Sequence, residues 1–262
     1  MKITDSHTHI FPQKIALKAS GATGEFYGVE MHYDGMAHTL SSCLADAGIE
    51  RALVCSPATT PHQVESINDF IAEKCKKYPQ FFGVATLHPD LPDPAAEIER
   101  LISLGLSGVK LHPDFQRFRI DDEKMFPTYK ILEEKGLPVL FHTGDKRYDF
   151  SGPVRLMNVI EKFPDLICIA AHFGGYSEWE NAKKYPKHKN LYFDTSSSLW
   201  VMPPDEAREF IDLFGEEQFM FGSDFPMWTP REELSKFLAL GLSDESNEKI
   251  LNANFERLFK IS

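Results

Sequence analysis

The sequence lacks long apolar segments and paired cysteines. No apolar run reaches the roughly eighteen residues that suggest a membrane span, and the N-terminal MKITDSHTHI has no apolar core of a secretory signal. The four cysteines, Cys43, Cys55, Cys75 and Cys168, show no CxxC spacing. We therefore expect a cytoplasmic protein with reduced, mostly buried thiols and no membrane contact.

Positive charge is also scarce. The chain has 28 Lys and Arg against 39 Asp and Glu, a formal net charge of −11. Because nucleic-acid binding usually needs a basic face, we expect a small-molecule partner and no nucleic acid. The chain contains no low-complexity segment, linker or short repeat, and 262 residues suit one α/β barrel. We predict a single domain over residues 1–262.

Short apolar or β-branched runs alternate with longer segments of helical periodicity. This alternation is typical of βαβ units and a parallel sheet. The eight predicted strands are Lys2–His9, Arg51–Ser56, Phe81–Leu87, Gly108–Leu111, Pro138–His142, Ile167–His172, Leu191–Asp194 and Phe219–Gly222. The intervening helices include PAAEIERLISLG, with an apolar face of Ile98, Leu101, Ile102 and Leu104, and MFPTYKILEEKG, which should end at Gly136.

Eight parallel strands can form an open sheet or a closed barrel. An open sheet concentrates its site at one switch point, whereas a barrel collects site residues from many strand ends. Polar residues close strands one, four, five, six and eight of the predicted set. We therefore predict a single (β/α)8 TIM barrel.

Two further segments carry structural predictions. Residues 11–37 include GATGEFYGVEMHYDG, which we predict to be a Gly-rich, aromatic loop over the barrel mouth. Residues 244–258 repeat apolar side chains at helical spacing and predict a final helix outside the barrel.

Histidines at three predicted strand ends indicate a metal site. His7 and His9 in DSHTHI project to the same side of a strand and can chelate one ion. His142 in LFHTG and His172 in AAHFGG end two other strands. Each histidine alone also fits an ordinary hydrogen-bonded core residue, but their recurrence at equivalent positions favours a shared site.

A carboxylate and a lysine extend this set. Asp224 in FGSDFP follows the last strand and either faces the barrel mouth or caps the helix near Pro230. Imidazoles with a carboxylate suit Zn²⁺ best, with Mn²⁺ or Fe²⁺ as alternatives. Lys110 and His112 in GVKLHP share a face, and either belong to the site or lie at its rim.

In combination these motifs resemble the amidohydrolase superfamily, in its amidohydrolase-2 branch. They run from residue 5 to residue 226 and are DSHTHI, GVKLHP, LFHTG, AAHFGG and FGSDFP. The branch is similar to aminocarboxymuconate-semialdehyde decarboxylase and pyrone-dicarboxylate lactonase. The resemblance implies one divalent ion held by His7, His9, His142 and Asp224, with His172 as an unliganded catalytic residue. In two-metal members of the superfamily, a lysine at the position of Lys110 bridges two ions, and the histidines at the positions of His142 and His172 bind the second, so a binuclear site is the alternative.

The resulting hypothesis is metal-dependent hydrolysis of an amide, lactone or ester bond of a small molecule. Asp224 would take the proton of the attacking water, and His172 would stabilise the oxyanion. The same ligands serve a second hypothesis, non-oxidative decarboxylation of an aromatic or unsaturated carboxylic acid. The third is a barrel that binds metal without catalysis.

Loop residues supply candidates for substrate binding. Arg119 and Arg147, like Arg117, follow strands four and five and could grip a carboxylate, although each also fits a solvated loop charge. Trp228 follows strand eight and fits either a substrate wall or ordinary packing. The resemblance also admits a homodimer.

Overall fold

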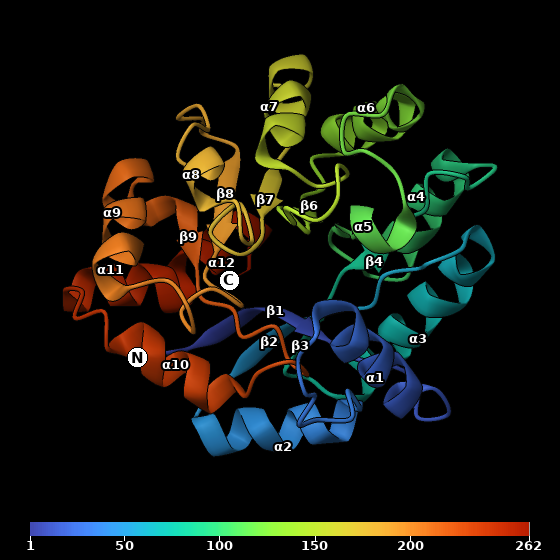
Figure 1. The fold of residues 1–262 in the computed structure, drawn as a ribbon. Helices are drawn as coiled ribbons and strands as arrows, with labels where there is room; N and C mark the ends of the chain where they lie inside the picture. The colour runs from blue at the N-terminus through green and yellow to red at the C-terminus, as the bar shows by residue number, and fades with distance from the viewer. Residues whose placement is uncertain (262) are drawn as a thin grey trace. The chain divides into compact units, whose positions relative to one another are not determined.

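A computed structural model describes residues 1–261 of the chain (Figure 1). They fold as two compact units. The first unit contains Met1–Cys55, Lys74–Phe82 and the described residues from Asp194 onward, and the second contains Ser56–Glu73 and Gly83–Phe193. The single domain over residues 1–262 stays a prediction.

Strands occur at all eight predicted positions. They are β1 (Thr4–His9), β2 (Arg51–Cys55), β3 (Phe81–Gly83), β4 (Ala85–Thr86), β5 (Val109–Leu111), β6 (Val139–Phe141), β7 (Cys168–Ala170), β8 (Leu191–Asp194) and β9 (Phe219–Met220). The third position holds two short strands, because β3 and β4 take part in different sheets.

In the first unit, β1, β2 and β3 lie side by side in that order. The β1–β2 pair is parallel and brings His9 opposite Cys55. The segment after β9 runs along the other side of β1, where the Ser6 backbone N–H donates to Phe221 O at 2.7 Å. The helices of this unit are α1 (Ala16–Tyr27), α2 (Ala37–Ala47), α9 (Pro204–Phe214), α10 (Pro230–Leu238), α11 (Asp244–Glu248) and α12 (Asn254–Phe259). Figure 1 shows α2 packed beside α10.

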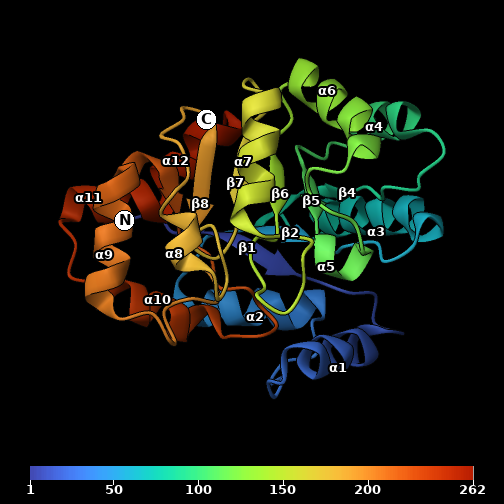
Figure 2. The same cartoon turned by 45° about the horizontal axis from the view of Figure 1, so that its top comes forward.

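In the second unit, β4 to β8 form parallel neighbours in sequence order, with the last residue of β8, Asp194, counted in the first unit. The helices are α4 (Pro94–Ser103), α5 (Pro113–Gln116), α6 (Phe126–Lys135), α7 (Pro153–Lys162) and α8 (Trp179–Ala182), and α3 (Val64–Lys77) begins here and ends in the first unit. Figure 2 shows α4 and α6 next to each other on one side of these strands.

Proline and capping side chains set where many helices begin. Proline occupies the first turn of α4, α5, α7, α9 and α10, where its missing N–H costs no helical hydrogen bond. Asp93 and Thr229 cap α4 and α10 through their side-chain oxygens. The predicted end of α6 at Gly136 is confirmed, since this glycine has a φ of 64°.

The predicted apolar face of α4 was partly wrong. Ile98 and Leu101 are fully buried, but Ile102 is 40% exposed. Glu97 is buried instead, because Asn68 donates to its Oε1 at 2.6 Å and Arg100 donates to its Oε2 at 2.8 Å. A paired and hydrogen-bonded carboxylate therefore takes a place that the hydrophobic pattern gave to an apolar residue.

The loop predicted over residues 11–37 is also partly wrong, since Ala16–Tyr27 forms α1. Gly24 lies inside this helix, and a Cβ there would be 2.6 Å from Met31 Cγ and 2.7 Å from Val29 O. Gly28 has a φ of 69° and ends the helix in the left-handed conformation. The glycines of this segment therefore serve close packing and helix termination.

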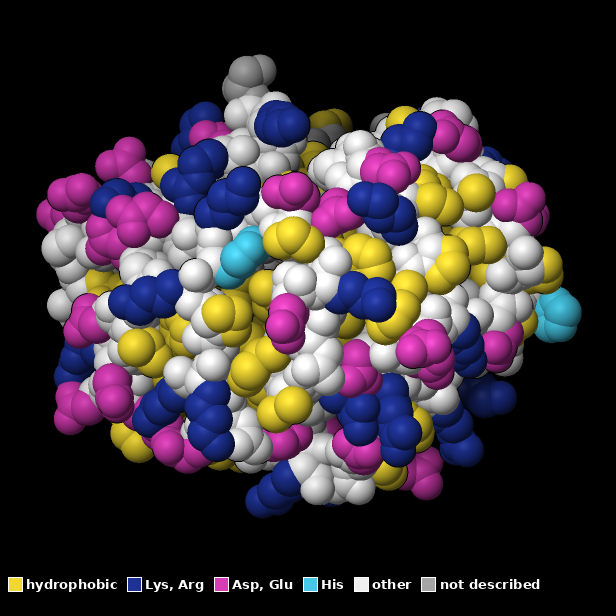
Figure 3. Space-filling model, turned by 90° about the horizontal axis from the view of Figure 1, so that it is seen from above, with side chains coloured by type: hydrophobic (Ala, Val, Ile, Leu, Met, Phe, Trp, Pro, Cys, Tyr) yellow, Lys and Arg dark blue, Asp and Glu magenta, His cyan; other side chains and the backbone are white. Residues whose placement is uncertain are grey.

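The predicted C-terminal helix is present with one irregularity. A π-helical segment, Lys249–Ala253, joins α11 to α12. All four cysteines are free thiols, and Cys55 and Cys168 are buried. No helix within residues 1–261 is long and apolar enough to cross a membrane. Acidic and basic side chains are interspersed over the face in Figure 3.

Candidate metal centre

The first unit contains a compact group of metal-binding side chains at the end of β1. His7 and His9 are two residues apart on this strand, and their Nε2 atoms lie 3.1 Å apart. The His7 side chain is 1% exposed and that of His9 is 13% exposed. The spacing of the two histidines therefore gives the neighbouring nitrogens that the DSHTHI motif predicts.

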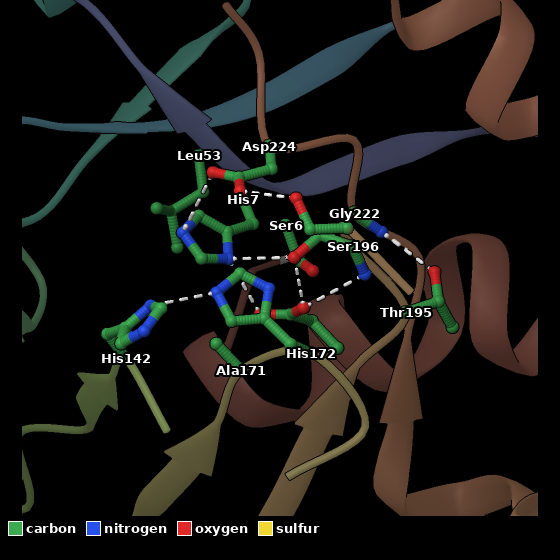
Figure 4. Close-up of polar contacts among 12 residues, drawn as sticks. Ser6, His7, Leu53, His142, Ala171, His172, Thr195, Ser196, Gly222 and Asp224 are labelled. Carbon is green, nitrogen blue, oxygen red and sulfur yellow. Dashed lines mark hydrogen bonds and ion pairs between the residues drawn. The ribbon is translucent and has the colours of Figure 1, made fainter. Parts of the chain in front are cut away.

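Asp224 joins this pair from the loop after β9. Its Oδ1 is 3.3 Å from His9 Nε2 and 3.7 Å from His7 Nε2, and Figure 4 shows its carboxylate facing the His7 ring. The loop can approach β1 closely because residue 222 is glycine, where a Cβ would be 3.0 Å from His7 Cβ. Thr229 caps α10, so the alternative that Asp224 caps this helix is wrong.

The outer nitrogens of both histidines are held by side chains from other strands. His7 Nδ1 lies 2.8 Å from Asp194 Oδ2 at the end of β8. His9 Nδ1 lies 3.4 Å from Cys55 Sγ at the end of β2, and that thiol donates to Thr8 O. An ionised carboxylate only accepts, and a thiol that already donates can only accept, so both Nδ1 atoms act as donors. The Nε2 atoms of His7 and His9 then direct their lone pairs toward each other and toward Asp224 Oδ1.

Three acceptors therefore face one another at the centre of the group. Two imidazole lone pairs and the Oδ1 atom of Asp224 repel each other unless a cation or a proton lies among them. Although burial lowers the pKa of His9, the neighbouring Cys55 and Asp224 raise it to about 9. The group thus favours positive charge, and its donor set fits a divalent metal ion.

Asp5 supports this group without facing it. It is fully buried, and its Oδ1 accepts from the backbone N–H of Ser223 at 2.9 Å and of His7 at 3.2 Å. Burial raises the pKa of Asp5 to about 7. The first residue of the DSHTHI motif therefore ties β1 to the loop that carries Asp224.

The second unit contains the other two histidines of the predicted site. His142 follows β6 and His172 follows β7, and His142 Nδ1 lies 3.0 Å from His172 Nε2 (Figure 4). Both rings are buried. His172 has a φ of 62°, a conformation that costs energy in a non-glycine residue and is frequent at functional sites.

His142 also contacts His112 and Asp114, which the sequence motifs did not predict as its neighbours. Its ring stacks on His112 with centroids 4.1 Å apart, and His112 stacks in turn on Phe115 at 3.7 Å. Its Nε2 lies 3.6 Å from Asp114 Oδ2, which also accepts from Ser151. Burial raises the pKa of Asp114 to about 7. His112, Asp114 and His142 together could also hold a cation.

The remaining predicted residues have clear local environments. Lys110 is fully buried in β5, opposite Leu140 of β6. Arg119 is exposed and pairs with Asp149 at 3.1 Å. Arg147 pairs with the buried Asp145 at 2.6 Å. In the first unit, the Trp228 ring lies 5.5 Å from that of Trp200.

Comparison with known proteins identifies the family. A family model described as amidohydrolase matches residues 4–261. The chain belongs to the amidohydrolase family. This amidohydrolase is therefore an enzyme, and the resemblance inferred from the five motifs is confirmed. Among curated proteins, none matches its sequence.

Solved structures show the fold of this amidohydrolase. An uncharacterised TIM-barrel protein from Bordetella bronchiseptica is 23% identical, with a TM-score of 0.78 and 99% of both chains covered. A dihydroxybenzoic acid decarboxylase from a Polaromonas species, with bound manganese and 2-nitroresorcinol, is 19% identical, with a TM-score of 0.74 and 99% and 97% covered. A probable 2-pyrone-4,6-dicarboxylic acid hydrolase from Acinetobacter baumannii is 16% identical, with a TM-score of 0.73 and 100% of both chains covered. The predicted (β/α)8 barrel is confirmed.

Sequence reasoning missed Asp194, Cys55 and Asp114. Asp194 ends a predicted strand, so the rule that selected the other site residues would have found it. Asp114 directly follows the GVKLHP segment, two residues after His112, and the same rule could have selected it. Cys55 gave no such signal, because its role depends on the pairing of β2 with β1.

Proposed function

We propose that this amidohydrolase is a metal-dependent hydrolase that cleaves an amide, lactone or ester bond of a small molecule. The observation that carries the proposal is the convergence of His7 Nε2, His9 Nε2 and Asp224 Oδ1, with both Nδ1 atoms held from behind. Such an arrangement is typical of a metal centre whose outer hydrogen bonds orient the ligands.

The proposed ligands are His7, His9 and Asp224, with His142 as the fourth ligand that the sequence predicts. Histidine nitrogen with one carboxylate suits Zn²⁺, and Mn²⁺ or Fe²⁺ as alternatives. The manganese in the Polaromonas decarboxylase supports a divalent ion of this class. Lys110 and His172 remain the proposed ligands of a second ion, which is the alternative to a single-ion site.

When bound, a divalent cation acts as a Lewis acid and lowers the pKa of water toward neutrality. Asp224 would accept the proton of the attacking water and pass it to the leaving group. His172 would donate a hydrogen bond to the oxygen on which negative charge develops. The burial of both histidines of the second unit favours this role, since hydrogen bonds to a developing charge are stronger away from bulk water.

The ion pairs of the candidate arginines favour hydrolysis over decarboxylation. A decarboxylase of this type would need a cationic side chain to hold the substrate carboxylate. Arg147 is paired with Asp145 of its own loop, and Arg119 is paired with Asp149 of the loop after β6. Arg117 is exposed. Trp228 stays a candidate for the substrate wall.

Decarboxylation of an aromatic or unsaturated carboxylic acid is the second candidate function. The observation in its favour is the likeness to solved decarboxylases, including a 2,6-dihydroxybenzoate decarboxylase with a TM-score of 0.75. Both candidates take a small molecule that carries a carboxylate or carbonyl group.

The two candidates are separated by assaying the metal-reconstituted enzyme on parallel panels of lactones, esters and amides and of aromatic carboxylic acids. Hydrolysis predicts product formation on the first panel without release of carbon dioxide. Carbon dioxide release on the second panel alone would overturn the hydrolase proposal. His172→Asn is expected to keep its metal content and lose turnover; unchanged turnover would remove His172 from the mechanism.

A further inference from the structure

Ser197 lies shortly after the end of β8, in the FDTSSS segment, and contacts Oδ2 of Asp224, whereas Oδ1 is the oxygen nearest His9 Nε2. It is buried, and its Oγ donates to Asp224 Oδ2 at 2.5 Å. We propose that Ser197 is a positioning residue that aims the Asp224 carboxylate at the metal ion, and that Trp228 fixes the direction of the Ser197 hydroxyl. The inference rests on the proposed function, because it assigns a role toward the same metal.

The direction of the hydroxyl proton follows from the chemistry of its neighbours. Trp228 Nε1 lies 2.9 Å from Ser197 Oγ, and an indole N–H can only donate. Ser197 Oγ must accept this bond, so its own proton is available for another acceptor. The nearby acceptors are the Asp224 carboxylate and the Met227 sulfur at 3.7 Å, and the carboxylate is far stronger. The hydrogen bonds therefore run from Trp228 through Ser197 to Asp224.

These hydrogen bonds give the two carboxylate oxygens of Asp224 different partners. Oδ2 accepts from Ser197, while Oδ1 lies 3.3 Å from His9 Nε2. A carboxylate held at one oxygen cannot rotate freely about its last side-chain bond, so Oδ1 stays directed toward the histidine nitrogens. Outer hydrogen bonds of this kind orient metal ligands and raise metal affinity.

The backbone is held in an unfavourable conformation at both ends of this contact. Ser197 has a φ of 50° and Asp224 a φ of 61°, and non-glycine residues adopt such values at a cost that surrounding contacts must offset. Trp200 Nε1 donates to the Ser197 carbonyl oxygen at 3.1 Å, so a second tryptophan holds the backbone of the same residue. Contacts on both the backbone and the side chain of Ser197 fit a residue whose orientation matters.

The position of Trp228 indicates that its N–H, more than its ring, serves the site. One neighbour of the ring is Trp200 at 5.5 Å, and another is Lys236, whose Nζ lies 5.2 Å from the ring centroid. Its Nε1 is the atom directed at Ser197. Trp228→Phe removes this donor and keeps an aromatic ring, and Trp200→Phe removes the donor to the Ser197 backbone, which makes it the matched control.

The test measures Mn²⁺ binding to metal-depleted full-length protein by electron paramagnetic resonance, which reports both the affinity and the coordination of the bound ion. Ser197→Ala is expected to weaken Mn²⁺ binding by about 10–100-fold and to change the spectrum of bound Mn²⁺. Trp228→Phe should give a smaller loss in the same direction. Trp200→Phe keeps the hydrogen bonds from Trp228 through Ser197 to Asp224 and loses only the contact to the Ser197 backbone, so it should lose less affinity than Trp228→Phe.

Wild-type affinity and spectrum in Ser197→Ala would overturn the inference and leave the proposed function standing. If Ser197→Ala does not fold, the two tryptophan variants decide. Weaker Mn²⁺ binding in Trp228→Phe than in Trp200→Phe supports the proposed role of the hydrogen bonds from Trp228 through Ser197 to Asp224. Equal Mn²⁺ binding in the two variants overturns it. A wild-type protein that binds no Mn²⁺ or Zn²⁺ would instead remove the proposed function, and the inference with it.

Discussion

At the scale of single residues, the site depends on side chains that hold other side chains. The sequence motifs identify the histidines and Asp224, because HxH on a strand and a carboxylate after a strand have recognisable chemistry. Of the residues that contact them from behind, Asp194 ends a predicted strand and could have been selected by the same rule, whereas Cys55 and Ser197 have no such signature. Cys55, Asp194 and Ser197 act through contacts with His9, His7 and Asp224, and those contacts depend on which strands and loops become neighbours.

Asp194 provides the first prediction. Asp194→Asn removes the negative charge that holds the Nδ1 proton of His7, so metal affinity should fall by about 10–100-fold. The measurement is a Zn²⁺ titration of the apo protein followed by calorimetry. The control is Asp165→Asn, an exposed residue whose ion pair with Lys189 is 3.6 Å long, and it should bind as wild type. Equal affinities for the two variants would show that Asp194 does not orient His7.

At the scale of the elements, strand positions were predictable because short apolar runs bounded by turn residues leave few alternatives. Helix α1 was not predictable from the same pattern. Gly21, Gly24 and Gly28 suggest a loop by composition, but only Gly28 has a positive φ. Whether a glycine breaks a helix or lets another segment approach it depends on packing that the local sequence does not contain.

Two glycines of α1 test this interpretation. Gly24→Ala should lower the free energy of unfolding by about 1–3 kcal/mol, because its Cβ would overlap Met31 and the Val29 carbonyl. Gly21→Ala should raise it by roughly 0.5–1 kcal/mol, since no atom lies within 4 Å of its Cβ and alanine favours a helix. Urea unfolding of both variants provides the comparison. If Gly24→Ala were as stable as Gly21→Ala, the close approach would have no energetic role.

Helix α10 carries a buried carboxylate with a pH-dependent effect on stability. Glu233 is 1% exposed, Lys236 donates to its Oε1 at 2.6 Å, and its Oε2 has no hydrogen-bond partner among residues 1–261. Burial raises the pKa of Glu233 above its usual value. The native state therefore binds this proton more tightly than the unfolded state, and stability falls as pH rises from the unfolded pKa through the folded one.

Glu233→Gln removes this loss of stability at higher pH. The Tm of Glu233→Gln minus that of wild type should be larger at about pH 8 than at about pH 5, because a larger fraction of wild type carries the buried charge at the higher pH. Differential scanning calorimetry at the two pH values measures it. Glu232→Gln on the exposed side of the same helix should show no such change. A Tm difference between Glu233→Gln and wild type that does not change with pH would contradict the raised pKa of Glu233.

At the scale of the whole molecule, the fold class and the family follow from motifs spread along the chain. Chemically capable residues at several strand ends favour a barrel over an open sheet, and the solved TIM-barrel protein with 99% of both chains covered bears this out. The reaction does not follow in the same way. The same ligands serve hydrolysis and decarboxylation, and the arginines that distinguish them become informative only when Asp145 and Asp149 are seen to pair with them.

The central claim is that His7, His9 and Asp224 bind a divalent metal ion, and metal content tests it most directly. Wild-type protein, depleted of metal and then reconstituted with Zn²⁺ or Mn²⁺, should retain stoichiometric metal after gel filtration when measured by mass spectrometry. The His7→Ala/His9→Ala variant should retain none while keeping the wild-type circular dichroism spectrum. Equal metal content in the two proteins, or none in the wild type, would contradict the account.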